Sequence, residues 1–186
     1  MKLTPRVKLL LIVALFAAPM VASVCAYLFM NVLPTANYGD LLLPPAQVTS
    51  HTFSREDGSP FRFADLRDRW ILVASDSGEC ARPCLEKLHM MRQVRVALGR
   101  DASRVVRVFV VDDVKAPNKT ALEPVEDLMV AITPRGLALA PGAANDRAHI
   151  YLVDPHGNVM MRWPESPDFR RMLKDLQTLL KASQIG

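Results

Sequence analysis

Outside its first eight residues, the chain has almost no net charge. Its 186 residues include 23 basic and 19 acidic side chains, and three of the basic ones, Lys2, Arg6 and Lys8, lie in the N-terminal tail. Taking those three from the 23 leaves 20 basic against 19 acidic side chains. A domain this close to neutral has no positive surface with which to bind phosphates, so we expect no nucleic-acid partner.

Charged side chains are absent altogether from residues 9–30. At a rise of about 1.5 Å per residue, a helix of these 22 residues would be about 33 Å long, enough to cross a bilayer. A cleaved signal peptide is the alternative, but its apolar region usually ends after about 7–15 residues. Cys25 suggests a lipoprotein, although Val24 stands where a small residue is expected. We therefore predict an uncleaved membrane anchor over residues 9–30.

The positions of the basic residues predict the orientation of this anchor. The three basic residues of the tail precede it, and the next lysine or arginine is Arg55. Residues 1–8 should therefore be the cytoplasmic tail of a single-pass protein of the inner (plasma) membrane. Residues 31–47 contain three prolines and predict a stiff linker. Residues 48–186 would then form one domain in the periplasm, which is an oxidising compartment.

Cysteine is scarce, and two of the three cysteines stand close together. Cys80 and Cys84 follow an apolar run, Trp70 to Ala74, of the kind that a buried parallel strand shows. A helix is predicted over residues 82–98, and Pro83 suits its first turn. Because the compartment is oxidising, an exposed cysteine pair is a candidate functional site.

Strand-like and helix-like segments alternate through the rest of the domain. The predicted strands cover 48–53, 60–63, 70–74, 104–111, 149–153 and 159–162, the predicted helices 82–98, 124–132 and 167–181, and a predicted loop 133–146. This order fits an α/β fold, a mixed sheet with helices on both faces. In such sheets functional groups gather at the carboxyl ends of the strands, where residues 75–84 and Asp112-Asp113 fall.

Several short motifs add a resemblance to a known family. They are Asp57-Gly58, Phe61-Arg62-Phe63, Asp65-Leu66, Trp70 to Val73, Cys80 and Cys84 at C-x3-C spacing, and Tyr151 to Gly157. With these motifs and its single anchor, the chain resembles the SCO branch of the thioredoxin-like superfamily over residues 53–185. The resemblance implies a thioredoxin-like fold on a membrane tether. It also implies a factor that handles Cu(I) or thiols during cytochrome c oxidase assembly, with an oxidase subunit as its partner.

The chain departs from the SCO pattern at three places. SCO proteins usually carry a proline after each cysteine, whereas Ala81 and Leu85 stand there. Their copper-binding histidine usually lies five residues before the tyrosine of the later strand, and that position is Asp146 in this chain. The nearest histidine is His149, and the aspartate-rich loop of the family is reduced to Asp112-Asp113.

Two thiolates and one imidazole would make a soft site suited to Cu(I). Cys80 and Cys84 flank the start of a predicted helix, where exposed backbone N–H groups favour the thiolate. His149 is the best third ligand, because its strand should lie beside the first buried strand; a buried, hydrogen-bonded histidine is the alternative. His89 with its neighbouring methionines is a weaker ligand set, because five residues of helix place His89 about 140° from Cys84.

The same pair suits a thiol–disulfide oxidoreductase instead. Pro83 directly before Cys84 resembles the thioredoxin motif, and Cys80, expected to be closer to solvent, would be the nucleophile. Thioredoxins place a cis-proline just before the strand that faces the cysteines. Residues 145–148 contain no proline, which favours a metal or a specialised thiol role.

Two structural alternatives stay open beside these. A static disulfide would close a very small loop and stabilise the fold only modestly, and a chain of this length does not need one. A docking module would carry vestigial cysteines. Peroxidase chemistry is not favoured, because the peroxiredoxin pattern has threonine and proline where Ser77 and Val73 stand.

Overall fold

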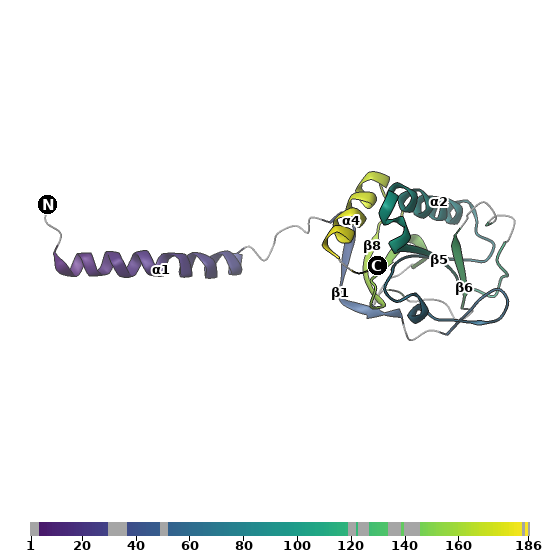
Figure 1. Ribbon diagram of the computed structural model, residues 1–186, viewed down its shortest axis with the longest axis horizontal. Coiled ribbons are helices and arrows are strands. Elements are labelled where there is room, and N and C mark those ends of the chain that lie inside the picture. The colour runs from purple at the N-terminus through teal and green to yellow at the C-terminus, as the bar shows by residue number, and fades with distance from the viewer. Residues whose placement is uncertain are drawn as a thin grey trace. The chain divides into compact units, whose positions relative to one another are not determined.

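A computed structural model of the chain divides it into two compact units, Met1–Ala36 and Asn37–Gly186 (Figure 1). The structure describes residues 4–29, 37–48, 52–118, 122, 127–133, 139, 146–183 and 185. Each unit is described by itself below.

The first unit holds one long apolar helix, α1, Pro5–Phe29. Its segment Pro5–Ala26 has a mean hydropathy of 2.6 and is not buried against any part of the chain. The helix begins at Pro5, ahead of the predicted anchor segment 9–30, because proline suits a first turn and the basic residues that follow are good helix formers. It is long and apolar enough to be a candidate membrane span.

The second unit is built on an eight-stranded mixed sheet with the order β1-β8-β7-β4-β5-β6-β2-β3. The strands are β1 Asp40–Gln47, β2 Phe53–Ser54, β3 Pro60–Phe61, β4 Trp70–Asp76, β5 Val105–Val111, β6 Leu128–Ile132, β7 Ile150–Val153 and β8 Asn158–Trp163. Strand β4 runs parallel to β5 and antiparallel to β7. The sheet is therefore mixed, as the sequence predicts.

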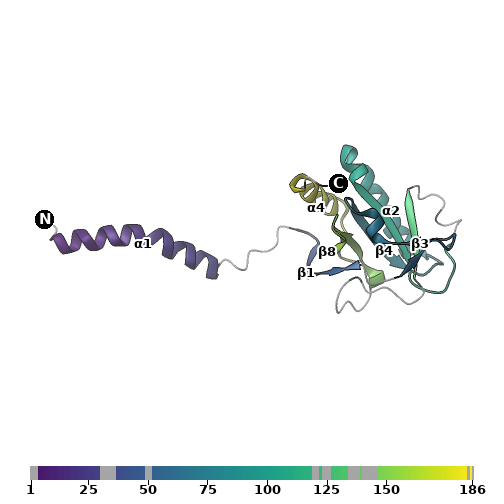
Figure 2. The same cartoon turned by 60° about the horizontal axis from the view of Figure 1, so that its bottom comes forward.

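Two α-helices, α2 Arg82–Ala97 and α4 Phe169–Ala182, pack side by side on one face of this sheet (Figure 2). Three short 3-10 helices complete the described elements: η2 Phe63–Leu66, η3 Gly99–Arg104 and η4 Asp146–Ala148. On the opposite face, the rings of Phe53, Phe61 and Phe63 pack edge to face. In the described part of the chain, long helices thus cover one face, whereas the element order predicts them on both.

Side chains along β4 alternate between two cores because successive residues of a strand point to opposite faces. Leu72 and Ala74 pack with α2 and α4, and Ile71 and Val73 pack in the core of the other face. Every residue from Trp70 to Ser75 is buried. This explains why the segment is an unbroken apolar run and why it was recognisable in the sequence.

Two segments differ from their predicted structures. Leu128–Ile132, predicted as the end of a helix, is strand β6 and pairs in parallel with β5; residues 124–126 lie outside the described part. A short apolar run does not distinguish helix from strand, and the pairing with β5 decides for the strand. Asp40–Gln47, predicted as linker, is β1, whose leucines at 41 and 42 are half-buried as it pairs with β8.

Candidate functional site

Cys80 and Cys84 lie at the carboxyl end of β4 and form a disulfide, with their Cα atoms 5.1 Å apart. Cys80 ends the turn after the strand, and Cys84 lies in the first turn of α2, where Pro83 opens the helix. Only 2% of Cys80 and 1% of Cys84 is exposed. Both side chains pack in the core on the α2 face, so neither sulfur is open to solvent in the oxidised pair, and Cys80 as the nucleophile stays a prediction.

A loop that follows β5 holds the turn in front of Cys80. The backbone N–H of Gly78 donates to Asp113 Oδ1 at 3.1 Å, and the N–H of Asn118 donates to the Gly78 carbonyl at 2.8 Å. Burial raises the pKa of Asp113, but hydrogen bonds from Ser77, Gly78 and Lys115 outweigh it, so its pKa is lowered. The Asp113 carboxylate therefore stays charged and holds the loop after β5 against the turn that contains Gly78.

Gly78 is the point of closest approach between this loop and the cysteine turn. A Cβ atom placed on it would lie 2.2 Å from the backbone carbonyl oxygen of Lys115. Real Cβ atoms do not approach backbone oxygens so closely, so only glycine fits without a movement of the loop.

Replacing Gly78 with alanine should lower the free energy of unfolding by about 1–3 kcal/mol, the usual cost of inserting an atom into a packed site. It should also speed reduction of the disulfide by dithiothreitol, because the displaced loop no longer covers the turn. Gly58→Ala is the control, since alanine there meets strain from a positive φ of 81° but open space, whereas at Gly78 the cost is a clash with the loop. If the two variants reduce at the same rate, the loop does not protect the disulfide.

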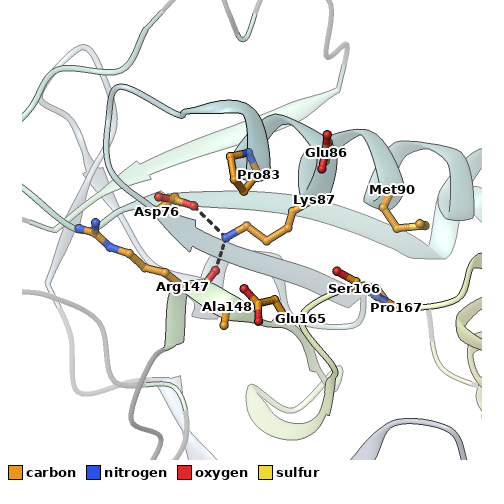
Figure 3. A pocket seen from close by; sticks show the side chains of 10 residues that line it. All are labelled: Asp76, Pro83, Glu86, Lys87, Met90, Arg147, Ala148, Glu165, Ser166 and Pro167. Atoms are coloured by element: carbon orange, nitrogen blue, oxygen red, sulfur yellow. Dashed lines mark hydrogen bonds and ion pairs between the residues drawn. The ribbon is translucent and has the colours of Figure 1, made fainter.

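A buried ammonium group joins α2 to the ends of two strands. Lys87 Nζ donates to the Ser75 carbonyl at 3.0 Å, to Asp76 Oδ2 at 2.9 Å and to the Arg147 carbonyl (Figure 3). The Lys87 side chain is 8% exposed. Because these acceptors use all three of its N–H groups, Lys87 fixes the helix that carries Cys84 against β4 and against the segment that precedes β7.

Arg147, whose carbonyl binds Lys87, has its own guanidinium charge balanced by two aspartates. It hydrogen-bonds to both carboxylate oxygens of Asp112 and lies 3.8 Å from Asp113 Oδ2. The hydrogen bond to Asp112 is the main reason that the pKa of Arg147 is raised, so its charge is retained. The Asp112-Asp113 pair, which the sequence compares with the aspartate-rich loop of SCO proteins, therefore binds a side chain of the protein itself.

A pocket of about 300 Å³ opens at the start of α2, between α2, the residues before β7 and the connection from β8 to α4 (Figure 3). Its lining residues are Asp76, Pro83, Glu86, Lys87, Met90, Arg147, Ala148, Glu165, Ser166 and Pro167. Pro83, the chain neighbour of Cys84, is the lining residue that links this pocket to the cysteine pair, and neither cysteine lines it.

His149 is not brought to the cysteines. Its Nδ1 lies 2.8 Å from the Trp163 carbonyl oxygen, and its ring packs edge to face on Tyr151, whose side chain belongs to the core of the sheet face opposite α2. Cys80 and Cys84 belong to the core on the α2 face. Among the described residues, no three His, Cys, Asp or Glu side chains are grouped closely enough to hold a metal ion.

Asp146, at the position of the SCO histidine, has a structural partner. Its Oδ1 accepts a 2.6 Å hydrogen bond from the Tyr151 hydroxyl, and its Oδ2 accepts one from the Leu139 N–H. Burial, followed by this hydrogen bond, raises the pKa of Tyr151, so the phenol stays protonated and keeps donating. The carboxylate thus holds the segment before β7 in place instead of presenting a ligand.

The structure divides the weaker predicted ligand set, His89 with its neighbouring methionines, between two faces of α2. His89 is exposed, whereas Met91 is fully buried in the core, so these two side chains lie on different faces of α2. His156 is exposed in the turn between β7 and β8, and His51 lies outside the described residues.

The sequence reasoning missed Lys87 and Arg147. Lys87 follows Cys84 by three residues, so the two share a helix face, and the neighbouring Leu88 marks that face as buried. A lysine among buried positions predicts a partner, and that signal was present in the sequence. The sequence does not indicate the ion pair of Arg147, because its partner Asp112 is 35 residues away in the chain.

Comparison with solved structures identifies the fold. Copper-bound Sco1 from yeast is 14% identical, with a TM-score of 0.62 over 76% of this chain and 94% of its own. Apo Sco1 from Thermus thermophilus is 18% identical, with a TM-score of 0.62 over 77% and 97%. A putative protein disulfide isomerase from Bacteroides thetaiotaomicron is 13% identical, with a TM-score of 0.55 over 78% and 94%. These similarities establish the thioredoxin-like fold.

The sequence itself matches one family model. No relative is found among proteins of curated function. Residues 70–183, which run from the start of β4 to the end of α4, match the model described as transmembrane-like, thioredoxin-like, C-terminal domain. The chain therefore belongs to the family of transmembrane-like, thioredoxin-like C-terminal domains.

Proposed function

We propose that the chain is a membrane-anchored assembly factor whose Cys80–Cys84 pair exchanges disulfides with the thiols of a partner protein. The observation that supports this most directly is the disulfide itself, formed at the strand-to-helix turn beside an open pocket. The thioredoxin-like fold places it at the carboxyl end of the central strands, where such sheets carry their functional groups.

The exchange would proceed in two balanced steps. A partner thiolate attacks Cys80 Sγ, the Cys80–Cys84 bond breaks, and Cys84 leaves as a thiolate at the start of α2, where the helix N-terminus stabilises negative charge. A second partner thiolate then attacks the mixed disulfide and releases Cys80. The partner loses two electrons and gains a disulfide, and the chain becomes the dithiol. The reverse sequence reduces a partner.

The anchor and its flanking charges support a location for this reaction. With basic residues only on its N-terminal side, α1 would place the N-terminus in the cytoplasm and the second unit in the periplasm. Disulfides persist in that compartment. An oxidase subunit, which the SCO resemblance suggests, would meet the factor at the outer surface of the inner membrane.

Delivery of Cu(I) is the second candidate function, since yeast Sco1, which shares the fold, has been solved with copper bound. Copper would be cargo, held by the two thiolates of the reduced pair, which are soft ligands suited to Cu(I). The third predicted ligand, His149, would have to reach them from the opposite sheet face. The described donor set fits two sulfur ligands better than the three-ligand site.

Redox titration of the full chain in detergent tests the first proposal. We expect the wild type to equilibrate with a glutathione buffer and to exchange with a dithiol peptide, and we expect Cys80→Ser to leave that peptide unoxidised because it has no Cys80–Cys84 disulfide to transfer. Cys25→Ser, which changes the exposed free cysteine of α1, is the control and should behave as wild type. A wild type that exchanges no faster than Cys80→Ser contradicts the proposal.

A Cu(I) titration of the same reduced chain distinguishes the second candidate. If copper is cargo, binding should be lost in Cys80→Ser. His149→Ala then separates two-sulfur binding, in which affinity is unchanged, from a three-ligand site, in which affinity falls. Absence of any thiol-dependent binding would rule out Cu(I) delivery through this pair.

A further inference from the structure

The cations that line the pocket at the start of α2 are already neutralised. Lys87 uses its three N–H groups on Ser75, Asp76 and Arg147, and the Arg147 guanidinium is bound by Asp112. Lys87 cannot bind an anion without giving up a present partner, and the charge of Arg147 is balanced by the two carboxylates of Asp112 and Asp113. An acidic ligand would therefore have to break the buried Lys87–Asp76 ion pair, which is costly, or approach Arg147 against two aspartates.

Two carboxylates that line the pocket are not neutralised by a cation of the pocket. Glu165, on the connection from β8 to α4, makes no ion pair or hydrogen bond within the described part of the chain. Glu86 lines the facing wall on α2, and its only described partner is Arg82, a side chain 90% exposed to solvent. Figure 3 shows the two glutamates on opposite sides of the pocket. A ligand in the pocket would therefore meet the negative charges of these two glutamates.

The remaining walls suit an aliphatic chain. Pro83 and Met90 on the wall of Glu86, and Ala148 and Pro167 on the wall of Glu165, present apolar atoms to the pocket (Figure 3). A volume of about 300 Å³ lies at the lower end of the range for ligand pockets, which suits one long side chain. Lysine and arginine have this form, since an apolar stem packs on apolar surface while the charged head reaches a carboxylate.

We propose that this pocket binds a lysine or arginine side chain that stands near the exchanging cysteine of the partner. The inference rests on the proposed exchange function, because the pocket adjoins Cys84 through Pro83. It makes Glu86 and Glu165 specificity-determining residues: they select a basic partner segment and bring its cysteine to Cys80.

Peptide binding tests this inference without requiring exchange. Two labelled peptides carry serine in place of cysteine and differ only in having lysine or glutamate two residues away. Fluorescence anisotropy with the oxidised full chain in detergent should show the lysine peptide binding about tenfold more tightly at low salt. Glu165→Gln and Glu86→Gln should each weaken it about threefold, as expected for exposed ion pairs. Glu56→Gln, which removes an exposed carboxylate elsewhere on the domain, is the matched control and should change nothing.

The outcomes separate the two proposals. Equal binding of the lysine and glutamate peptides, or equal effects of Glu165→Gln and Glu56→Gln, overturns the cation pocket. Binding of the lysine peptide without any exchange by its cysteine version supports the pocket and contradicts the exchange function. Loss of the lysine preference when salt is raised supports the pocket, since screening weakens exposed charge pairs.

Discussion

Replacing Asp175 with alanine should lower the free energy of unfolding of the second unit by about 3–5 kcal/mol. The Asp175 side chain is buried in α4 and accepts hydrogen bonds from the N–H groups of Tyr38 and Gly39, at 3.0 and 2.8 Å, and from Trp163 Nε1, at 3.0 Å. Alanine would leave three donors without an acceptor, and each buried unsatisfied donor costs about 1–3 kcal/mol. The variant also releases the start of the domain from α4.

Urea denaturation followed by tryptophan fluorescence measures this loss. Asp168→Ala is the control, because Asp168 also accepts a backbone hydrogen bond on α4, from Arg171 at 2.9 Å, but at the exposed N-cap. Loss of an N-cap costs about 1 kcal/mol. Equal destabilisation by the two variants would show that the Asp175 cluster does not hold β1 and α4 together.

Replacing Lys87 with methionine should cost about 3–5 kcal/mol, the usual effect of removing one partner of a buried ion pair. Methionine keeps the length of the side chain but leaves the Asp76 carboxylate, 20% exposed, without its cation. It also removes the donor shared by Ser75 and Arg147. Because Lys87 ties the helix of Cys84 to both strand ends, the reduction potential of the disulfide should shift as well.

A double-mutant cycle with Asp76→Asn tests whether the stability lost in Lys87→Met comes from the unpaired Asp76 carboxylate. The double variant should recover part of the stability lost in Lys87→Met, because the unpaired carboxylate is gone. Lys115→Met is the control: its ion pair with Glu79 is exposed, so its loss should cost less than about 1 kcal/mol. If Lys87→Met is no worse than Lys115→Met, the buried ammonium does not organise the site.

The elements that were predictable from sequence are those whose pattern is set locally. The unbroken apolar run of β4 and the proline at the start of α2 each indicate one structure, and the structure confirms both. The helix after Asp168 is confirmed for the same reason, since the N-cap and the apolar spacing are local signals. Strand β6 was mistaken for a helix because its apolar residues fit either period, and only pairing with β5 decides.

The candidate site was predictable only in part, for the same physical reason. Cys80 and Cys84 are four residues apart, and their pairing follows from the turn between them. The face on which His149 lies depends on the register of β7 against β4, which no local pattern determines. The network around Lys87 joins residues up to 60 positions apart, so it becomes visible only in the folded chain.

Strand β1 forms one open edge of the sheet, and its prolines affect what can pair there. It ends the strand order, and an open edge normally offers backbone N–H and C=O groups to which a strand of another protein can be added. Pro44 and Pro45 lie within β1 and are exposed, and proline has no N–H to donate. Because the N–H positions of adjacent strand residues point to opposite edges, one of these two prolines faces the open edge and would leave an acceptor of an added strand unpaired. The two prolines thus make the β1 edge a poor template for strand addition, which protects the sheet from edge-to-edge association.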